Sequence, residues 1–315
     1  MRTIETIGIF GAGTMGANIA QEFALYGYQV RLYSRTAATL EGAKAVMETG
    51  LALMAEEGLT CEAAARDAMG RITFTTSLEE AAEGCDWVME TITENPAAKT
   101  ALFEQLDAVC PMGVLFSSDT SGMDIFPLVP KRRLPDTLIT HYVAPAHLIP
   151  LVELVRGEHT TDDVVEGMRA IYEKMGKIPI VLDKYVPGFI LNRIQGAIEN
   201  EVSWMLEEAI VSPEELDLAI KSSLMLRGVV LGVVQRSDFT GLDSRHHIRT
   251  SNPYVPPKSE GRAQEELYQQ GHYGVKTGKG FYDYGGRSKE DVYAQRDRRI
   301  IKVWKAASDM IKNPV

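Results

Sequence analysis

Two side chains in the middle of the chain, His141 and Glu153, have the types and the spacing of a proton-transfer pair. Glu153 lies 12 residues after His141, beyond a loop bounded by Pro145 and Pro150 that could fold the carboxylate back towards the imidazole. An imidazole can accept a proton near neutral pH, and a neighbouring carboxylate orients it and supports its positive charge. A single histidine is more often structural than catalytic. Together, however, the two residues indicate the base of an enzyme that oxidises a secondary alcohol.

A glycine-rich turn near the N-terminus indicates a dinucleotide site. The sequence GAGTMG places Gly11, Gly13 and Gly16 around Thr14 and Met15, after a strand-like run and before a helical pattern. In this setting the first glycine allows a tight turn, the second lets the backbone approach a pyrophosphate, and the third allows close helix packing. The N-terminus of the helix would then face the phosphate charge. The motif predicts NAD or NADP, with FAD as a less favoured alternative because the same turn also serves flavoproteins.

The residues after the second expected strand bear on the choice of nicotinamide cofactor. An acidic residue about 20 positions past the glycine motif would bind the ribose 2′-hydroxyl of NAD. This chain has Ser34, Arg35 and Thr36 there, and none of them would repel a 2′-phosphate. Arg35 could contact that phosphate or stack on the adenine, which makes NADP an option. Alternatively, Arg35 is a solvated surface residue and NAD is held by other contacts.

Hydrophobic patterning predicts that these residues lie on a layered α/β domain. The first 33 residues predict a strand, a helix and a second strand, and this alternation of strands and helices continues to residue 182. Strands are expected at 3–10, 29–33, 72–76, 86–92, 114–118, around His141, and at 178–182. Helices are expected at 14–26, 37–57, 61–69, shortly after Ser77, and at 97–109. This order favours a Rossmann-like, doubly wound and mostly parallel sheet.

The pattern changes after about residue 185. Apolar residues recur at helical spacing over 189–210, and Ser212, Pro213 and Glu215 have the types of an N-cap, a first-turn proline and a capping-box carboxylate. We therefore expect an NAD(P)-binding domain at residues 1–185 and an all-helical domain at residues 186–315. The substrate is expected in the cleft between them.

Composition argues against several kinds of partner. The chain has 315 residues, and its 33 basic and 43 acidic side chains give a formal charge of −10. That balance argues against binding to nucleic acid or to an anionic membrane. No apolar run is long enough to cross a bilayer and no secretory signal is recognisable, so a cytoplasmic protein is expected. The three widely spaced cysteines indicate neither a disulfide framework nor a metal site.

Six motifs in order resemble the L-3-hydroxyacyl-CoA dehydrogenase family, including its members that act on free hydroxy acids such as carnitine and L-gulonate. The motifs span nearly the whole chain: GAGTMG at 11–16, TENPAAK at 93–99, SSDTSG at 117–122, HYVAPAHLIPLVE at 141–153, VPGFILNR at 186–193 and GVKTGKGFYDY at 274–284.

The resemblance implies roles for individual residues. His141 would be the general base and Glu153 its partner, Ser121 would hydrogen-bond the reacting oxygen, and Asn192 would help to hold the substrate. The residues implied at the cofactor, besides the glycine turn, are Glu94, Lys99, Lys276 and again Ser121. The resemblance also implies a homodimer formed through the helical domain.

Two residues depart from the family pattern. Asp119 stands where the S-N-T-S block has asparagine, and Ala144 stands where an asparagine usually precedes the proline after the catalytic histidine. The amide missing at Ala144 removes a hydrogen bond of about 0.5–1.5 kcal/mol or leaves space for a different substrate. Either change could alter specificity, whereas the intact His141 and Glu153 favour an active enzyme.

The charge on the expected helix pair at 41–70 favours a small acid over a CoA thioester. In acyl-CoA members this region is rich in lysine and helps to bind the CoA phosphates. Here its basic residues are Lys44 and Arg66, and its acidic residues are Glu41, Glu48, Glu56, Glu57, Glu62 and Asp67. Such a surface binds phosphate poorly.

The sequence therefore predicts NAD(P)-dependent interconversion of a small 3-hydroxy acid, or a related secondary alcohol, and its ketone. One alternative is a true 3-hydroxyacyl-CoA dehydrogenase, and another is a non-catalytic, crystallin-like dinucleotide-binding protein. A free carboxylate substrate would need a cationic partner. The candidates are Arg193, Arg227 and Arg236.

Overall fold

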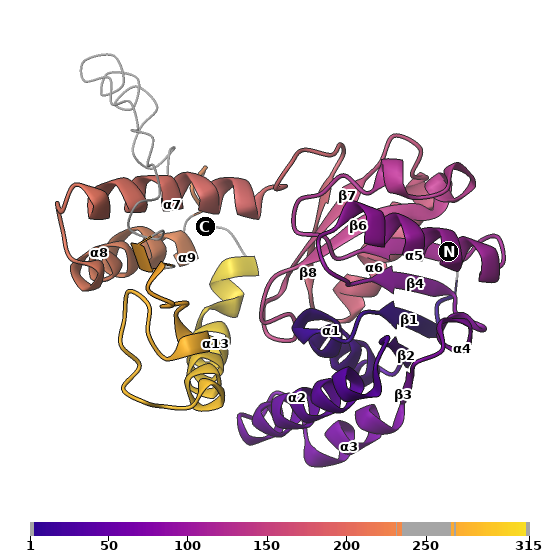
Figure 1. The fold of residues 1–315 in the computed structure, drawn as a ribbon, viewed down its shortest axis with the longest axis horizontal. Coiled ribbons are helices and arrows are strands. Elements are labelled where there is room, and N and C mark those ends of the chain that lie inside the picture. Colours follow the sequence, from indigo (N-terminus) through magenta and orange to yellow (C-terminus); the bar gives the residue numbers. More distant parts are fainter. Residues whose placement is uncertain (1–2, 231, 235–265, 268, 313–315) are drawn as a thin grey trace. The chain divides into compact units, whose positions relative to one another are not determined.

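The computed structural model describes residues 3–230, 232–234, 266–267 and 269–312. The chain forms two compact units, residues 1–193 and 194–315, whose elements are shown in Figure 1. No helix in the described part of the chain is both long and apolar enough to cross a bilayer.

Unit 1 is built on one eight-stranded sheet with the order β3-β2-β1-β4-β5-β6-β7-β8. The strands are β1 (Thr6–Phe10), β2 (Gln29–Tyr33), β3 (Ile72–Thr75), β4 (Trp87–Glu90), β5 (Leu115–Ser118), β6 (Thr137–Tyr142), β7 (Leu151–Arg156) and β8 (Ile178–Leu182). All neighbouring strands pair in parallel except β6 and β7. The order reverses between β1 and β4, and in such sheets ligands bind outside the carboxyl ends of the strands at that point.

Helices cover both faces of the sheet because successive strand residues point to opposite sides. On one face lie α1 (Thr14–Leu25), α2 (Ala37–Glu56), α3 (Glu62–Gly70) and α6 (Asp162–Lys174), which share an apolar cluster with Ile9 and Trp87. On the other face lie α4 (Leu78–Ala82) and α5 (Pro96–Val109), which pack with Phe10 and Val88. The predicted doubly wound, mostly parallel sheet is therefore confirmed.

Strand β7 was not predicted from the sequence. It runs antiparallel to β6, and His141 and Glu153 are direct partners in the register. Because the two strands run in opposite directions, the first residues of β7 lie at the same sheet edge as the last residues of β6. The loop between Tyr142 and Leu151 therefore folds the chain back at the edge where the parallel strands end.

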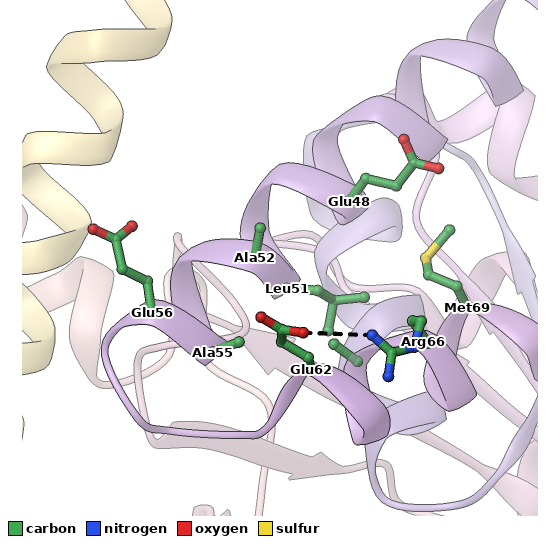
Figure 2. A pocket seen from close by; sticks show the side chains of 9 residues that line it. Glu48, Leu51, Ala52, Ala55, Glu56, Glu62, Arg66 and Met69 are labelled. Carbon is green, nitrogen blue, oxygen red and sulfur yellow. Dashed lines mark ion pairs between the residues drawn. The ribbon is translucent and has the colours of Figure 1, made fainter.

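Helices α2 and α3 enclose a groove of about 700 Å³ (Figure 2). Its apolar wall includes Leu51 and Met69, and its charged lining residues are Glu48, Glu56, Glu62 and Arg66. Arg66 lies 3.5 Å from Glu62, and both side chains are exposed. The charged lining of the groove is therefore mainly acidic, and its one basic residue, Arg66, is paired with a carboxylate.

The described part of unit 2 is helical. Helix α7 (Leu191–Glu207) begins in the last residues of unit 1 and is followed by α8 (Pro213–Ile220), a π-helical turn (Lys221–Met225), α9 (Leu226–Val230) and α13 (Lys289–Lys312). The Ser212 hydroxyl accepts the Glu215 N–H at 3.2 Å and donates to the Glu215 carboxylate at 3.1 Å, so Ser212 is the N-cap of α8 as predicted. The helical character predicted for the C-terminal part is also confirmed.

Candidate active site

His141 and Glu153 form a buried pair on neighbouring strands. The imidazole Nδ1 lies 2.7 Å from Glu153 Oε2, and the two side chains are 7% and 0% exposed. Their direct pairing in the β6/β7 register explains the contact, because opposed residues of an antiparallel pair point to the same face. The loop bounded by the two prolines thus folds the carboxylate back to the imidazole, as the spacing predicted.

The second oxygen of Glu153 is held by the start of helix α7. Oε1 accepts the N–H groups of Ile190 and Leu191 at 2.8 and 3.0 Å. Burial by itself would raise the pKa of Glu153, but the hydrogen bonds from His141, Leu191 and Ile190 outweigh it and lower that pKa. The carboxylate therefore stays ionised at neutral pH and accepts a hydrogen bond from the protonated Nδ1 of His141.

Phe189 packs against the imidazole immediately before α7. It is 1% exposed, its ring centroid lies 5.4 Å from that of His141, and its backbone has a φ of +51°. Few non-glycine residues adopt this conformation, which costs of order 1–3 kcal/mol. The helix consequently begins at Leu191 and not at Phe189 as the sequence suggested.

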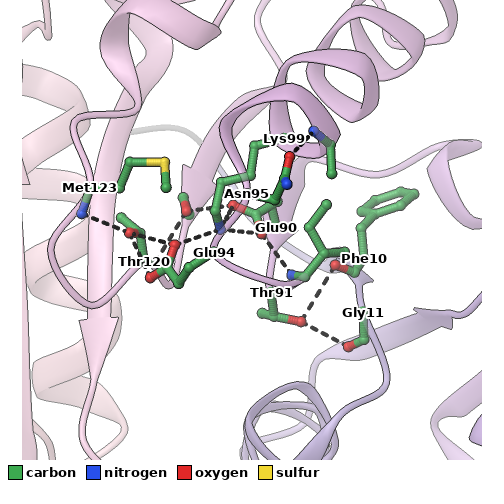
Figure 3. Close-up of polar contacts among 12 residues, drawn as sticks. Phe10, Gly11, Glu90, Thr91, Glu94, Asn95, Lys99, Thr120 and Met123 are labelled. Carbon is green, nitrogen blue, oxygen red and sulfur yellow. Dashed lines mark hydrogen bonds and ion pairs between the residues drawn. The ribbon is translucent and has the colours of Figure 1, made fainter.

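The glycine turn has the geometry that a dinucleotide requires. Gly11 has a φ of +128°, and a Cβ there would meet the Thr91 carbonyl oxygen at 2.6 Å. A Cβ on Gly16 would lie 1.8 Å from the Gly11 oxygen, so α1 can pack this closely only with glycine. The Thr91 hydroxyl donates to the Gly11 oxygen at 2.8 Å (Figure 3) and fixes the turn to β4.

The approach to the N-terminus of α1 is open. A Cβ on Gly13 would meet nothing within 4 Å, and Gly13, the N-cap residue, offers no side chain to the first amides of the helix. No acidic residue lies in the first turn, which contains Thr14 and Met15. Uncapped amides and the helix dipole favour an anion at this point, so the turn fits the pyrophosphate of NAD(P).

At the end of β2, Ser34 is buried and Arg35 is exposed. The Ser34 N–H donates to the Thr75 oxygen at 3.3 Å, and Thr36 caps α2 through the Thr39 N–H. None of residues 34–36 has a carboxylate that could accept the ribose 2′-hydroxyl. The Arg35 side chain is accessible to solvent.

Hydrogen bonds link three of the predicted residues, Glu94, Ser121 and Asn192, in a row. Glu94 Oε1 accepts the N–H of Ser121 at 2.6 Å and lies 3.1 Å from its hydroxyl, and the Asn192 amide donates to the Ser121 carbonyl at 2.7 Å. Burial opposes ionisation of Glu94, but the Ser121 N–H, Lys99 and Thr120 together lower its pKa. Ser121 and Asn192 are therefore held together beside an anionic side chain.

The Lys99 side chain is buried and contacts two carboxylates of this region (Figure 3). Its ammonium lies 2.7 Å from Glu90 and 3.3 Å from Glu94. The Ser118 hydroxyl and the Ile92 N–H also donate to Glu90, whose pKa is raised by burial against the effect of these partners. In this structure Lys99 forms an ion pair with Glu94, and its contact with the cofactor stays a prediction.

Sequence reasoning missed Glu90 and Thr120. Glu90 is 0% exposed at the end of an otherwise apolar strand, which was the available signal because a buried carboxylate needs partners. Among the other predicted residues, Lys276 lies in the short turn Val275–Thr277 of unit 2, and its side chain is outside the described part. Arg236 is also outside the described residues. Arg193 contacts the Pro187 oxygen, and Arg227 contacts the Ser223 oxygen.

A doubly wound sheet with an open glycine turn at its switch point and a His–Glu pair at the same edge defines a dinucleotide-dependent dehydrogenase. Residues 6–185 match the model of the 3-hydroxyacyl-CoA dehydrogenase NAD-binding domain, and residues 188–284 match that of the C-terminal domain. The chain belongs to the 3-hydroxyacyl-CoA dehydrogenase family. It is an NAD(P)-dependent enzyme that acts on CH–OH groups, as the sequence predicted.

Relatives with different substrates align over most of the chain. A probable 3-hydroxybutyryl-CoA dehydrogenase of Deinococcus radiodurans is 34% identical over 286 residues, 88% of this chain and 99% of the relative. L-carnitine dehydrogenase of Streptomyces coelicolor is 30% identical over 308 residues, 96% and 95% of the two chains. The 5-formyl-3-hydroxy-2-methylpyridine 4-carboxylate 5-dehydrogenase of Mesorhizobium japonicum is 28% identical over 303 residues, 95% and 97% of the two chains.

A solved structure supports the same family. The crystal structure of a 5-formyl-3-hydroxy-2-methylpyridine 4-carboxylic acid 5-dehydrogenase, described as an NAD⁺-dependent dismutase, gives a TM-score of 0.87 at 26% identity. The match covers 99% of this chain and 100% of that one.

Proposed function

We propose that the protein interconverts a small 3-hydroxy acid, or a related secondary alcohol, and its ketone without a CoA carrier. The observation that carries the proposal is the buried 2.7 Å contact between His141 and Glu153 at the carboxyl edge of a dinucleotide-binding sheet. When bound, NAD(P) supplies the hydride acceptor or donor. The other steps belong to side chains of this chain.

In this mechanism His141 moves the hydroxyl proton through Nε2. Glu153 keeps Nδ1 protonated and stabilises the imidazolium that forms, because its own pKa is low. Glu94 holds the Ser121 backbone through the N–H, and the Ser121 hydroxyl would turn its single proton from the Glu94 carboxylate to the reacting oxygen. Asn192, anchored to the Ser121 carbonyl, would orient the substrate from the start of α7.

The absence of CoA from the proposed substrate is supported by the groove between α2 and α3. The family resemblance places the CoA phosphates on this helix pair, whereas the groove here is lined by Glu48, Glu56 and Glu62, with Arg66 beside Glu62. Carboxylates at a phosphate site repel it and raise the KM of the thioester. Relatives named for carnitine and for a pyridine carboxylate are consistent with a free acid.

The proposal is tested by following NADH and NADPH oxidation with free acetoacetate and acetoacetyl-CoA side by side. We expect the free acid to be the better substrate of the two, and a panel of hydroxy acids and ketones then identifies the best one. Rapid turnover of the thioester alone would show that the groove does not exclude CoA. That result would favour the second candidate, a true 3-hydroxyacyl-CoA dehydrogenase, which the 34% identity to a 3-hydroxybutyryl-CoA relative supports.

Three further features are part of the proposal. A functional division near residue 185 is supported by the family models, which meet between residues 185 and 188. A homodimer is supported by exposed apolar side chains on the helices of unit 2, including Leu218 and Leu226. The cytoplasmic location stays a prediction from the sequence, and the preferred dinucleotide depends on Ser34 and Arg35.

A further inference from the structure

Asp119 lies immediately after β5, on the chain segment that crosses the carboxyl edge of the sheet. Its N–H donates to the Glu90 oxygen at 2.9 Å, so its backbone is fixed to β4. The side chain is half-buried and extends to the neighbouring strand, where Oδ1 accepts the N–H of Tyr142 at 2.8 Å. Asp119, which directly follows β5, is thus hydrogen-bonded both to the last residue of β4 and to the last residue of β6.

The bond to Tyr142 occurs where the β5/β6 ladder has ended. The last residues of β5 and β6 that pair are Ser118 and Ile139, three positions before Tyr142. On its other side β6 continues to pair with β7 through His141 and Tyr142. In the described structure, the end of β6 is therefore held by β7 backbone on one side and by the Asp119 side chain on the other.

The residue held in this way adjoins the proposed base. Tyr142 directly follows His141 and is 1% exposed, and its ring centroid lies 5.6 Å from that of Tyr172. A shift of the Tyr142 backbone towards β7 would move the imidazole relative to any ligand at the sheet edge. Misplacement of a catalytic group by about 1 Å can cost roughly 100-fold in rate.

The surroundings of Asp119 favour a neutral carboxyl group. Burial raises its pKa well above the usual range, the Tyr142 N–H lowers it in part, and the nearby carboxylates of Glu90 and Glu94 raise it against the opposite effect of Lys99. A neutral carboxyl offers the same acceptor oxygen as an asparagine amide. An asparagine should therefore replace Asp119 without loss of the bond.

We propose that Asp119 is a positioning residue for His141, because its side-chain oxygen completes the β5/β6 pairing at Tyr142 and fixes the strand that carries the imidazole. The kinetic part of this inference rests on the proposed function.

The test compares Asp119→Ala with Asp119→Asn. We expect D119A to lower kcat by about 10- to 100-fold with little change in the KM for NADH, and D119N to restore most of the lost rate. Hydrogen exchange at the Tyr142 amide should be slow in the wild type and in D119N, and about tenfold or more faster in D119A. Asp124→Ala is the matched control, since Asp124 Oδ1 accepts the Phe126 N–H at 3.1 Å in the same loop. Its kcat should stay near that of the wild type.

Two results would overturn the assignment. Rapid exchange of the Tyr142 amide in the wild type would show that Asp119 does not hold it. A D119N variant as slow as D119A, with the amide still protected, would show that the carboxyl group itself takes part in the chemistry. If the wild type turns over no ketone, the proposed function fails, but the exchange measurements still decide whether Asp119 fixes the strand.

Discussion

At the residue scale, the two carboxylate oxygens of Glu153 have different hydrogen-bond partners. One oxygen holds the His141 imidazole and the other accepts two amides at the start of α7. The carboxylate cannot rotate without losing one set of partners, so the orientation of the imidazole is coupled to the position of the helix. Such mutually supporting contacts keep a catalytic group in place before the substrate arrives.

Substituting His141 with alanine should lower kcat by about 10²- to 10⁴-fold, the usual contribution of a general base. NADH affinity should change by less than about threefold, because the glycine turn is at another part of the sheet edge. Steady-state kinetics and a fluorescence titration with NADH separate the two effects. His159→Ala, at an exposed histidine, is the control. Near-normal turnover by H141A would refute the assignment.

Substituting Glu153 with glutamine should affect both activity and stability. Because the folded pKa of Glu153 lies below its ordinary value, the stabilisation is present above the ordinary carboxyl pKa and is lost as the pH falls through the folded pKa. E153Q should therefore lower kcat and, near pH 7, cost about 1–3 kcal/mol of unfolding free energy. Urea unfolding at several pH values checks this. An unchanged acid dependence of stability in E153Q would contradict it.

Substituting Ser34 with aspartate should shift the enzyme towards NADH. A carboxylate at the end of β2 would accept the ribose 2′-hydroxyl of NADH and repel the 2′-phosphate of NADPH. We expect the kcat/KM ratio of NADPH to NADH to fall by about tenfold or more. Ser34→Ala is the uncharged control and should leave the ratio close to that of the wild type. Equal ratios in all three proteins would show that this position does not contact the ribose.

At the element scale, the sequence could predict most strands and helices of unit 1 because each has its own periodic pattern. Strand β2 and helix α5 lie within a residue of their predicted bounds. Strand β7 could not be recognised in the same way, since the run LVELVR contains a buried carboxylate and its pairing depends on β6 and β8. The partners of Glu153 at Ile190 and Leu191 are backbone amides, which no side-chain motif reveals.

The acidic groove between α2 and α3 should limit the use of acetoacetyl-CoA as a substrate. Replacing Glu48 and Glu62 together by lysine would remove two carboxylates and leave Arg66 without its ion-pair partner. The kcat/KM for acetoacetyl-CoA should then rise by about 3- to 10-fold at low ionic strength, while that for free acetoacetate should not change. The double variant E83K/E104K changes the net charge equally on exposed residues outside the groove. A similar rise in that control would show a general charge effect and no groove-specific one.

At the scale of the whole molecule, one buried ion pair ties distant segments of unit 1 together. The Lys177 ammonium, next to β8, lies 2.7 Å from Glu22 on α1 and donates to the carbonyl oxygens of Ala146 and Ile149. The Lys177 ammonium, which lies next to β8, therefore contacts both helix α1 and the loop between His141 and Glu153. This arrangement was not predictable from the sequence, because Glu22 and Lys177 are 155 positions apart and each resembles an ordinary surface charge.

Glu22 should make the stability of unit 1 depend on pH near neutrality. Burial raises its pKa to about 7, although Lys177 acts in the opposite direction. The folded state then holds a proton that the unfolded state has released, so this contribution is present below the ordinary carboxyl pKa and is lost as the pH rises through about 7. Glu22→Gln should make the slope of unfolding free energy against pH, between about 5 and 7.5, shallower by up to roughly 1 kcal/mol per pH unit.

The two units need not unfold together, so the measurement requires a probe confined to unit 1. Trp87 is such a probe, since it is fully buried on β4, whereas the other two tryptophans, Trp204 and Trp304, belong to unit 2. Urea unfolding followed by fluorescence, with Trp204 and Trp304 replaced by phenylalanine, therefore isolates the relevant transition. Glu83→Gln, at an exposed carboxylate, is the control and should keep the wild-type slope. If E22Q also keeps that slope, Glu22 does not titrate in this range, and the ion pair with Lys177 is fully charged throughout it.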